Sequence, residues 1–62
     1  MEQALTPIDH WWNDPSIPIV EIDGRLFALS GWNGRSYRHC WEVEPHDHRQ
    51  KTDDREYIIT PV

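Results

Sequence analysis

Four residues with metal-binding side chains lie close together in the sequence: His39, Cys40, His46 and His48. Zinc accepts imidazole nitrogen and thiolate sulfur as ligands, so this group is a candidate metal site. The spacing argues against it, because His39 and Cys40 are neighbours on an expected strand and therefore point to opposite faces. The chain also lacks a Cys-x-x-Cys pair. We expect no metal and no other cofactor, and a small metal-stabilised structural protein remains as an alternative function.

Nucleophilic catalysis would depend on Cys40 acting with a histidine and an acid. A lone cysteine on a strand is more often a small buried apolar residue. So short a chain also has little interior in which to enclose a substrate pocket. Gly31 and Gly34 bracket a turn, but the Lys-Ser or Lys-Thr of a phosphate-binding loop does not follow them. We predict that the protein is not an enzyme.

Tryptophans are the most informative apolar residues, since the 62 residues include four of them. Strand alternation assigns Trp41 to the core, and Trp11 and Trp12 join Ile8 in an apolar stripe on an expected helix. Trp32 instead lies between two turn glycines, where burial is difficult to arrange. Because exposed tryptophans often anchor protein interfaces, we predict that Trp32 contacts a partner.

Pairs of acidic residues occupy alternate positions of two expected strands: Glu42 with Glu44, and Glu21 with Asp23. Residues two apart on a strand point the same way and stand about 6.6 Å apart. Phosphates along a DNA strand have a similar order of spacing, with about 3.4 Å of rise per step, so such carboxylates can imitate a row of phosphates. The predicted partner-binding residues are Glu21, Asp23, Trp32, Glu42, Glu44, Asp47, Asp53 and Asp54.

Charge is unevenly distributed along the chain, which has a net charge of −5. Residues 1–24 hold five acids and no Lys or Arg, residues 25–40 hold three arginines and no acid, and residues 41–62 carry −3. Proteins that bind duplex DNA are usually basic, so we expect no direct binding to nucleic acid. An acidic surface instead steers association with a basic groove on a protein partner.

The length of 62 residues predicts one small domain, residues 1–62. A domain of this size buries about 60% of its unfolded surface, so its core is thin. Cys40 is the only cysteine, which excludes a disulfide within the chain. No apolar run is long enough to cross a bilayer, and no basic-then-apolar signal begins the chain. We therefore expect a cytoplasmic protein, and we expect it to be a monomer without membrane contact.

The first element that could position these residues is a short helix. Thr6 can cap it, and Pro7 suits the first helical position. Asn13 can adopt the left-handed conformation that ends a helix, and the following Asp14-Pro15 prevents its continuation. The sequence predicts a helix over about Pro7 to Asn13.

A hairpin is the clearest local signal, because Asp23-Gly24 separates two apolar runs. A two-residue turn at this point places Val20 opposite Phe27. Pro18 cannot donate to a ladder, so we expect the first strand of the hairpin to begin there or to lie at a sheet edge.

The rest of the chain predicts two further extended segments separated by a polar loop. A third strand is expected over residues 36–44, with its core face formed by Tyr37, His39, Trp41 and Val43. Residues 45–54 read as a loop, and the β-forming residues of segment 55–60 predict a last strand. The predicted fold is α+β, a small antiparallel β-meander of three or four strands with one short N-terminal helix.

Two segments, Pro18-Ile-Val-Glu-Ile-Asp-Gly24 and Trp41-Glu-Val-Glu44, together with the small size and acidity, resemble small phage-encoded anti-CRISPR proteins. The chain is most similar to short acidic inhibitors of the type I-C effector complex. This resemblance implies an inhibitor that occludes DNA binding by the effector, with its DNA-binding subunit as partner and the bacterial host cytoplasm as location. It implies no particular functional residue. A phage assembly adaptor that dimerises through an edge strand is a further alternative.

Overall fold

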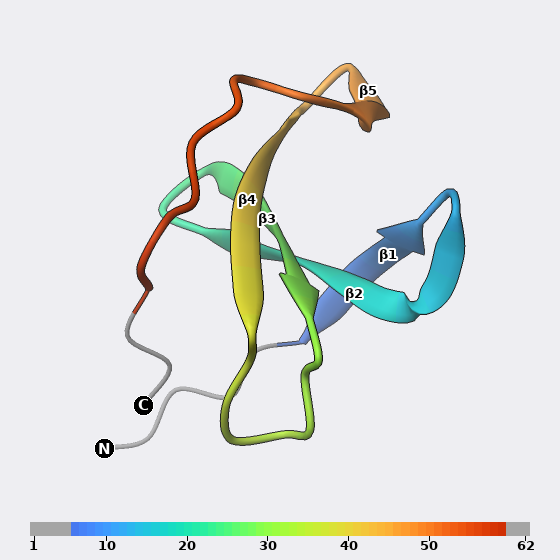
Figure 1. Ribbon diagram of the computed structural model, residues 1–62. Coiled ribbons are helices and arrows are strands. Elements are labelled where there is room, and N and C mark those ends of the chain that lie inside the picture. The colour runs from blue at the N-terminus through green and yellow to red at the C-terminus, as the bar shows by residue number, and fades with distance from the viewer. Residues whose placement is uncertain (1–5, 60–62) are drawn as a thin grey trace.

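The computed structural model describes residues 6–59, and within this range the chain forms five strands and no helix (Figure 1). The strands pair antiparallel with their neighbours in chain order. The fold of the described residues is therefore all-β, so the predicted α+β class is wrong, although the expected antiparallel sheet is present. No helix in this range could span a membrane. The strands are β1 (Pro7–Trp11), β2 (Asp14–Ile22), β3 (Arg25–Ser30), β4 (His39–Glu44) and β5 (Asp47–Lys51).

Strand β1 occupies the segment for which the sequence predicted a helix. It pairs with β2, aligning Pro7 with Val20 and His10 with Pro18, and two register shifts interrupt the pairing. A helix of seven residues has few internal hydrogen bonds and is marginal on its own. Pairing with the long strand β2 satisfies the backbone instead, so tertiary context decides the conformation of this segment.

The predicted hairpin is confirmed. Strands β2 and β3 pair with Val20 opposite Phe27, as the turn position requires. Asp23 and Gly24 have φ values of 53° and 78°. Positive φ at both central residues defines the tight turn whose twist suits two antiparallel strands.

The expectation that the first hairpin strand begins at Pro18 or lies at a sheet edge is wrong, because β2 begins at Asp14 and lies between β1 and β3. Pro18 is buried and aligned with His10 of β1. Pairing between β2 and β3 starts only at Ile19, which aligns with Ala28. The missing N–H of Pro18 therefore falls before that ladder begins.

The sheet curls into a half-barrel. In a flat sheet β1 and β4 would stand three strand spacings apart, about 14 Å. The ring centroids of Trp11 on β1 and Trp41 on β4 are only 5.2 Å apart. At the two sheet edges, Asp9 Oδ2 of β1 lies 2.7 Å from His48 Nδ1 of β5. These contacts close the sheet towards the side of the two tryptophans, which we call the inner face, and the opposite side is the outer face.

Each face has its own apolar core. On the inner face the buried residues pack against the half-buried Trp11, Ile17 and Trp41, and they are Ile19, Leu26, Ala28 and Val43. On the outer face the buried residues are Val20, Phe27, Leu29 and Cys40. Two-sided burial explains why the apolar runs of β2 and β3 are continuous rather than alternating.

Two segments outside the strands cover the outer face. The loop between β3 and β4 contributes Trp32 and Tyr37, and the C-terminal segment 52–59 contributes Tyr57 and Ile59. Figure 1 shows this C-terminal segment, in orange and red, on the opposite side of β4 from β1. The backbone N–H of Tyr57 donates to the carbonyl of Cys40 over 2.8 Å.

Three predictions for residues after position 35 need correction. The polar segment 45–54 contains β5, whose side chains contribute little apolar surface and which forms by pairing its backbone with β4. Residues 55–59 lie across the outer face and are not a strand, and residue 60 lies outside the described residues. The third strand starts at His39, so alternation does not extend to Tyr37, which packs on the outer face while Trp41 packs on the inner face.

Candidate interaction surface

The structure disperses the histidines and the cysteine that suggested a metal site. Cys40 is buried in the outer-face core, where desolvation raises the pKa of its thiol to about 11. His39 contacts Glu56 across 2.6 Å, His48 contacts Asp9 at the sheet edges, and His46 is exposed. Among residues 6–59, no three His, Cys, Asp or Glu side chains converge in a way that could hold a metal ion. Cys40 therefore serves packing, and His39 and His48 make pairwise polar contacts.

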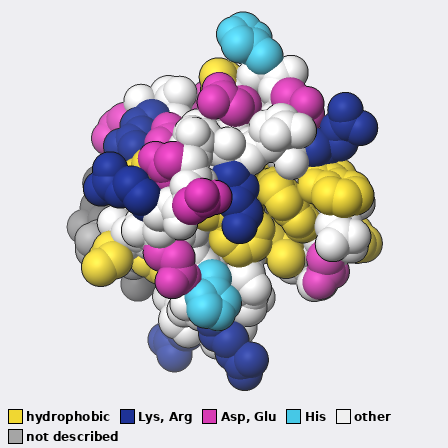
Figure 2. Space-filling view, turned by 45° about the horizontal axis from the view of Figure 1, so that its top comes forward, with side chains coloured by type: hydrophobic (Ala, Val, Ile, Leu, Met, Phe, Trp, Pro, Cys, Tyr) yellow, Lys and Arg dark blue, Asp and Glu magenta, His cyan; other side chains and the backbone are white. Residues whose placement is uncertain are grey.

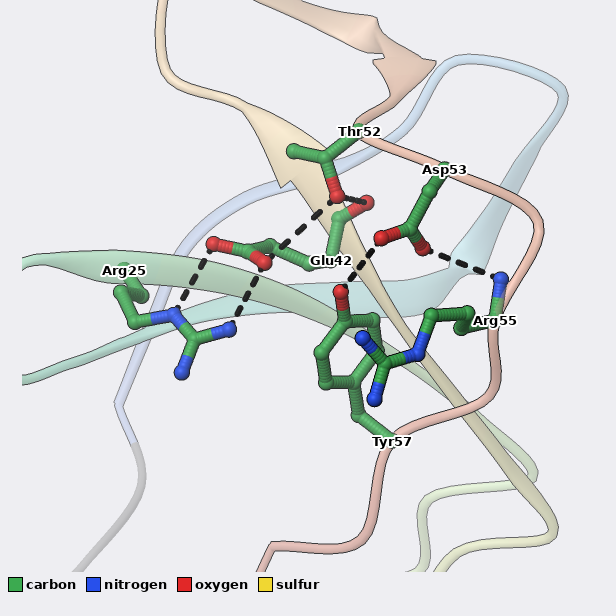
Figure 3. A network of polar contacts seen from close by, with 6 residues as sticks. All are labelled: Arg25, Glu42, Thr52, Asp53, Arg55 and Tyr57. Atoms are coloured by element: carbon green, nitrogen blue, oxygen red, sulfur yellow. Dashed lines mark hydrogen bonds and ion pairs between the residues drawn. The ribbon is translucent and has the colours of Figure 1, made fainter.

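Glu42, one of the predicted partner-binding acids, is engaged within the molecule. The Arg25 guanidinium donates to both of its carboxylate oxygens, over 3.0 and 2.8 Å (Figure 3). The same guanidinium lies over the rings of Phe27 and Tyr57. The hydrogen bonds from Arg25 hold the pKa of Glu42 below its ordinary value. A bidentate pair of this kind neutralises the carboxylate and leaves it little charge to offer a partner.

Asp53 and Asp47 are also held by contacts within the chain. The Tyr57 hydroxyl donates to Asp53 over 2.7 Å, and the Arg55 N–H donates to the same side chain over 3.0 Å (Figure 3). These bonds lower the pKa of Asp53, and the Asp53 carboxylate raises the pKa of Tyr57. Asp47 accepts from the N–H and the Nε of Arg49, which lowers its pKa.

The two predicted pairs of strand acids do not form one acidic row. Directly opposite residues of an antiparallel pair project to the same face. Glu21 aligns with the inner-face residue Leu26, whereas Glu42 aligns with the outer-face residue Phe27. Asp23 belongs to the turn, a register shift precedes Glu44, and both side chains are exposed, as is Asp54. A continuous imitation of a phosphate strand is therefore not built by these residues.

Trp32 does not occupy the exposed position that the sequence predicted. It is half-buried against the outer-face core. The side chain of Asn33 accepts hydrogen bonds from the N–H groups of Arg35 and Ser36, each over 2.9 Å, which folds this loop back on itself. The exposed tryptophan is Trp12, with 61% of its surface accessible. Its position next to the Asn13-Asp14-Pro15 turn was the sequence signal that could have identified it.

Trp12 extends a row of aromatic rings that begins on the inner face of the half-barrel. Its ring centroid lies 6.3 Å from that of Trp11, at an interplanar angle of 49°. Trp11 in turn meets Trp41 edge to face, at 79°. We call Trp11, Trp12 and Trp41 the tryptophan rim. Figure 2 shows a face on which hydrophobic side chains form a patch bordered by charged side chains.

One cation of the chain already contacts this rim. Lys51 Nζ stands 4.8 Å from the ring centroid of Trp41, a geometry in which the ring quadrupole attracts the ammonium group. The indole Nε1 of Trp41 is buried without a hydrogen-bond partner in the described part of the chain. The ring is therefore held by packing and by the cation over its face.

The hairpin that carries Trp11 and Trp12 is strictly acidic. Residues 6–24 contain four acids and no Lys or Arg. The contact with His48 lowers the pKa of Asp9, and hydrogen bonds from Ser16 lower the pKa of Asp14. Both carboxylates are thus ionised at neutral pH, and the exposed ring of Trp12 stands in a region of negative charge.

No family model, curated protein or solved structure matches the chain.

Proposed function

We propose that this protein is a small acidic binding module, acting in the cytoplasm, that inhibits a nucleic-acid-handling complex by occupying a basic groove on it. The observation that carries the proposal is the contrast in charge pairing between the two parts of the molecule. Among the described residues no Lys or Arg pairs with an acid of hairpin β1–β2, where Asp9 contacts His48 and Asp14 accepts from Ser16. On the other strands, Arg25 pairs with Glu42 and Arg49 pairs with Asp47.

The negative charge of the hairpin, which contains no Lys or Arg, sets the mode of association. A negative surface steers encounter with a positive groove and disfavours acidic competitors, so it acts mainly on association rate and specificity. Affinity then depends on a few well-buried anchors in the centre of the contact. The exposed Trp12 and Ile8 of this hairpin are suitable anchors, since 61% and 54% of their respective surfaces are accessible.

The proposed partner is the DNA-binding subunit of a type I-C CRISPR effector, whose DNA channel supplies a basic groove. The contact surface in this proposal is the hairpin rather than the Glu42–Glu44 pair, because Arg25 already neutralises Glu42. Glu21 is the hairpin acid best suited to a test, since it is exposed on β2 and is not one of the two central turn residues, Asp23 and Gly24.

A charge reversal tests this proposal. Glu21→Lys should weaken inhibition several-fold in a type I-C interference assay, because it places like charge against the groove. Asp54→Lys is the matched control, an equally large change at an exposed acid outside the hairpin, and it should inhibit as the parent does. Circular dichroism should show both variants folded. Equal inhibition by both variants would reject the electrostatic mechanism, and failure of the parent to inhibit or to capture the effector would reject the function.

A further inference from the structure

We propose that the tryptophan rim binds an arginine side chain of the basic partner, with its guanidinium group stacked on the exposed ring of Trp12. This inference rests on the proposed function and names the chemistry of the contact. Trp12 has 61% of its surface accessible, although its ring contacts that of Trp11 at 6.3 Å. The ring thus contacts a neighbouring ring while most of its surface stays accessible to a stacking group.

The tryptophan rim already binds one cation of the chain. The ammonium group of Lys51 lies over Trp41 at 4.8 Å, so one ring is satisfied from within the chain. In the part of the chain that the structure describes, no Lys or Arg lies over Trp12. Trp12 therefore offers a second aromatic face of the same kind, open to a cation from outside.

A carboxylate close to Trp12 gives this surface charge complementarity to arginine. Asp14 aligns with Trp11 in the β1–β2 pairing and lies two residues from Trp12 in the chain. Its carboxylate accepts from the N–H and the hydroxyl of Ser16, over 3.0 and 2.7 Å, and has lone pairs left for a further donor. A guanidinium group can stack on an indole and donate to a carboxylate at the same time.

Arginine suits this surface better than lysine. Its planar guanidinium stacks on an aromatic face and is more weakly hydrated than an ammonium group, so it loses less solvation on contact. A phosphate backbone suits the surface poorly, because residues 6–24 carry only negative formal charge. The partner segment that we propose is therefore an arginine-bearing stretch of protein.

The test uses fluorescently labelled octa-arginine and octa-lysine peptides and measures binding to the full chain by anisotropy at physiological salt. We expect tighter binding of octa-arginine, and we expect Trp12→Ala to weaken it about fivefold, the size of an exposed cation–π contact. Trp12→Phe should retain part of the affinity. Ile58→Ala is the matched control, since Ile58 is an exposed apolar residue, 93% accessible, on the C-terminal segment, and its removal should change nothing.

Several results would overturn the inference. Unchanged octa-arginine binding by folded Trp12→Ala would do so, as would equal affinity for the two peptides or no binding of octa-arginine. Binding of duplex DNA that is lost in Trp12→Ala would assign the surface to nucleic acid. Inhibition in the interference assay separates the two proposals, because Trp12-dependent peptide binding without inhibition by the parent rejects only the proposed function. Inhibition by a parent that does not bind octa-arginine rejects only the arginine contact.

Discussion

The two faces of the half-barrel are covered in different ways. The outer-face core lies beneath the chain itself, since the β3–β4 loop and the C-terminal segment place Trp32, Tyr37, Tyr57 and Ile59 over it. The inner-face core is bordered by three side chains, Trp11, Ile17 and Trp41, all carried by strands of the sheet. Segments outside the sheet therefore cover the outer face, whereas side chains of the sheet itself border the inner face.

Charge follows the same division. Over the outer face, Arg25, Glu42, Asp53 and Tyr57 satisfy one another in a connected network (Figure 3). On the other side of the comparison, the hairpin β1–β2 carries acids and the exposed Trp12 and contains no arginine or lysine. Net charge alone therefore does not locate an interaction surface in this molecule, because many of its acids already have partners within the chain.

The largest expected effect is the loss of stability when one leucine is removed from either core. Leu29→Ala on the outer face and Leu26→Ala on the inner face should each lower the free energy of unfolding by about 2–5 kcal/mol. We expect the greater loss for Leu29, since it is 0% exposed and Leu26 is 6% exposed. Urea unfolding of the two variants measures the difference. Equal losses would show that the side chains of the sheet cover the inner face as completely as the added segments cover the outer face.

The second largest effect is expected at the turn between β2 and β3, because both strands contribute residues to both cores. Gly24 has a φ of 78°, and a Cβ placed there would meet no atom within 4 Å. Gly24→Val should therefore destabilise through backbone strain alone, by at least ~1 kcal/mol. Gly24→Asn is the control, because asparagine tolerates positive φ, and it should cost less. Identical unfolding midpoints for the two variants would contradict this account of the turn.

A hydroxyl group anchors the cover of the outer face. Tyr37 accepts from the N–H of Ile59 over 2.9 Å and donates to the carbonyl of the same residue over 3.2 Å. Tyr37→Phe should cost about 1 kcal/mol and should speed exchange of the Ile59 amide hydrogen. Amide exchange followed by NMR would measure this loss. Unchanged protection at Ile59 would show that apolar packing alone holds the C-terminal segment.

Acid should weaken both regions, and the outer region more. The pKa of Glu42 is lowered by Arg25 and that of Asp9 by His48, so each group stabilises the fold above its unfolded pKa. That stability is lost as the pH falls through the ordinary values of 4.5 and 3.8 and below. Unfolding midpoints should be measured for both variants from neutral to acidic pH. We expect the midpoint of Glu42→Gln to change less with pH than that of Asp9→Asn. The reason is that 16% of the Glu42 side chain is exposed, against 49% for Asp9. The reverse order would place the stronger of the two contacts at the sheet edges.

Local turn chemistry made part of the fold predictable. Asp23-Gly24 specified both the position and the register of one hairpin, because few backbone conformations join two strands in two residues. Segment Pro7–Trp11 carried equally local signals for a helix, but they concerned caps and spacing within too few residues to outweigh pairing with β2. Local signals were reliable where they fixed a backbone angle and unreliable where they depended on the partner of the segment.

Assignment of a single core face caused most errors at the candidate site. Alternation along β4 correctly separated Trp41 and Val43 from Cys40, but only the side of Trp41 was assigned to the core, although the side of Cys40 carries a second core. The cover of that side comes from distant parts of the chain, which periodicity cannot reveal. For the same reason the sequence favoured Trp32 as the exposed ring and missed Trp12.

The order of the strands has a consequence for the lifetime of the folded state. Each strand pairs only with its neighbour in the chain, so hairpins can form in succession without closing long loops. The contact between Asp9 and His48 joins residues 39 positions apart and can form only after the sheet has curled. Contacts that form late are largely absent from the transition state, so their loss accelerates unfolding and leaves the folding rate nearly unchanged. This edge-to-edge contact therefore contributes to how long the half-barrel stays closed more than to how quickly it is built.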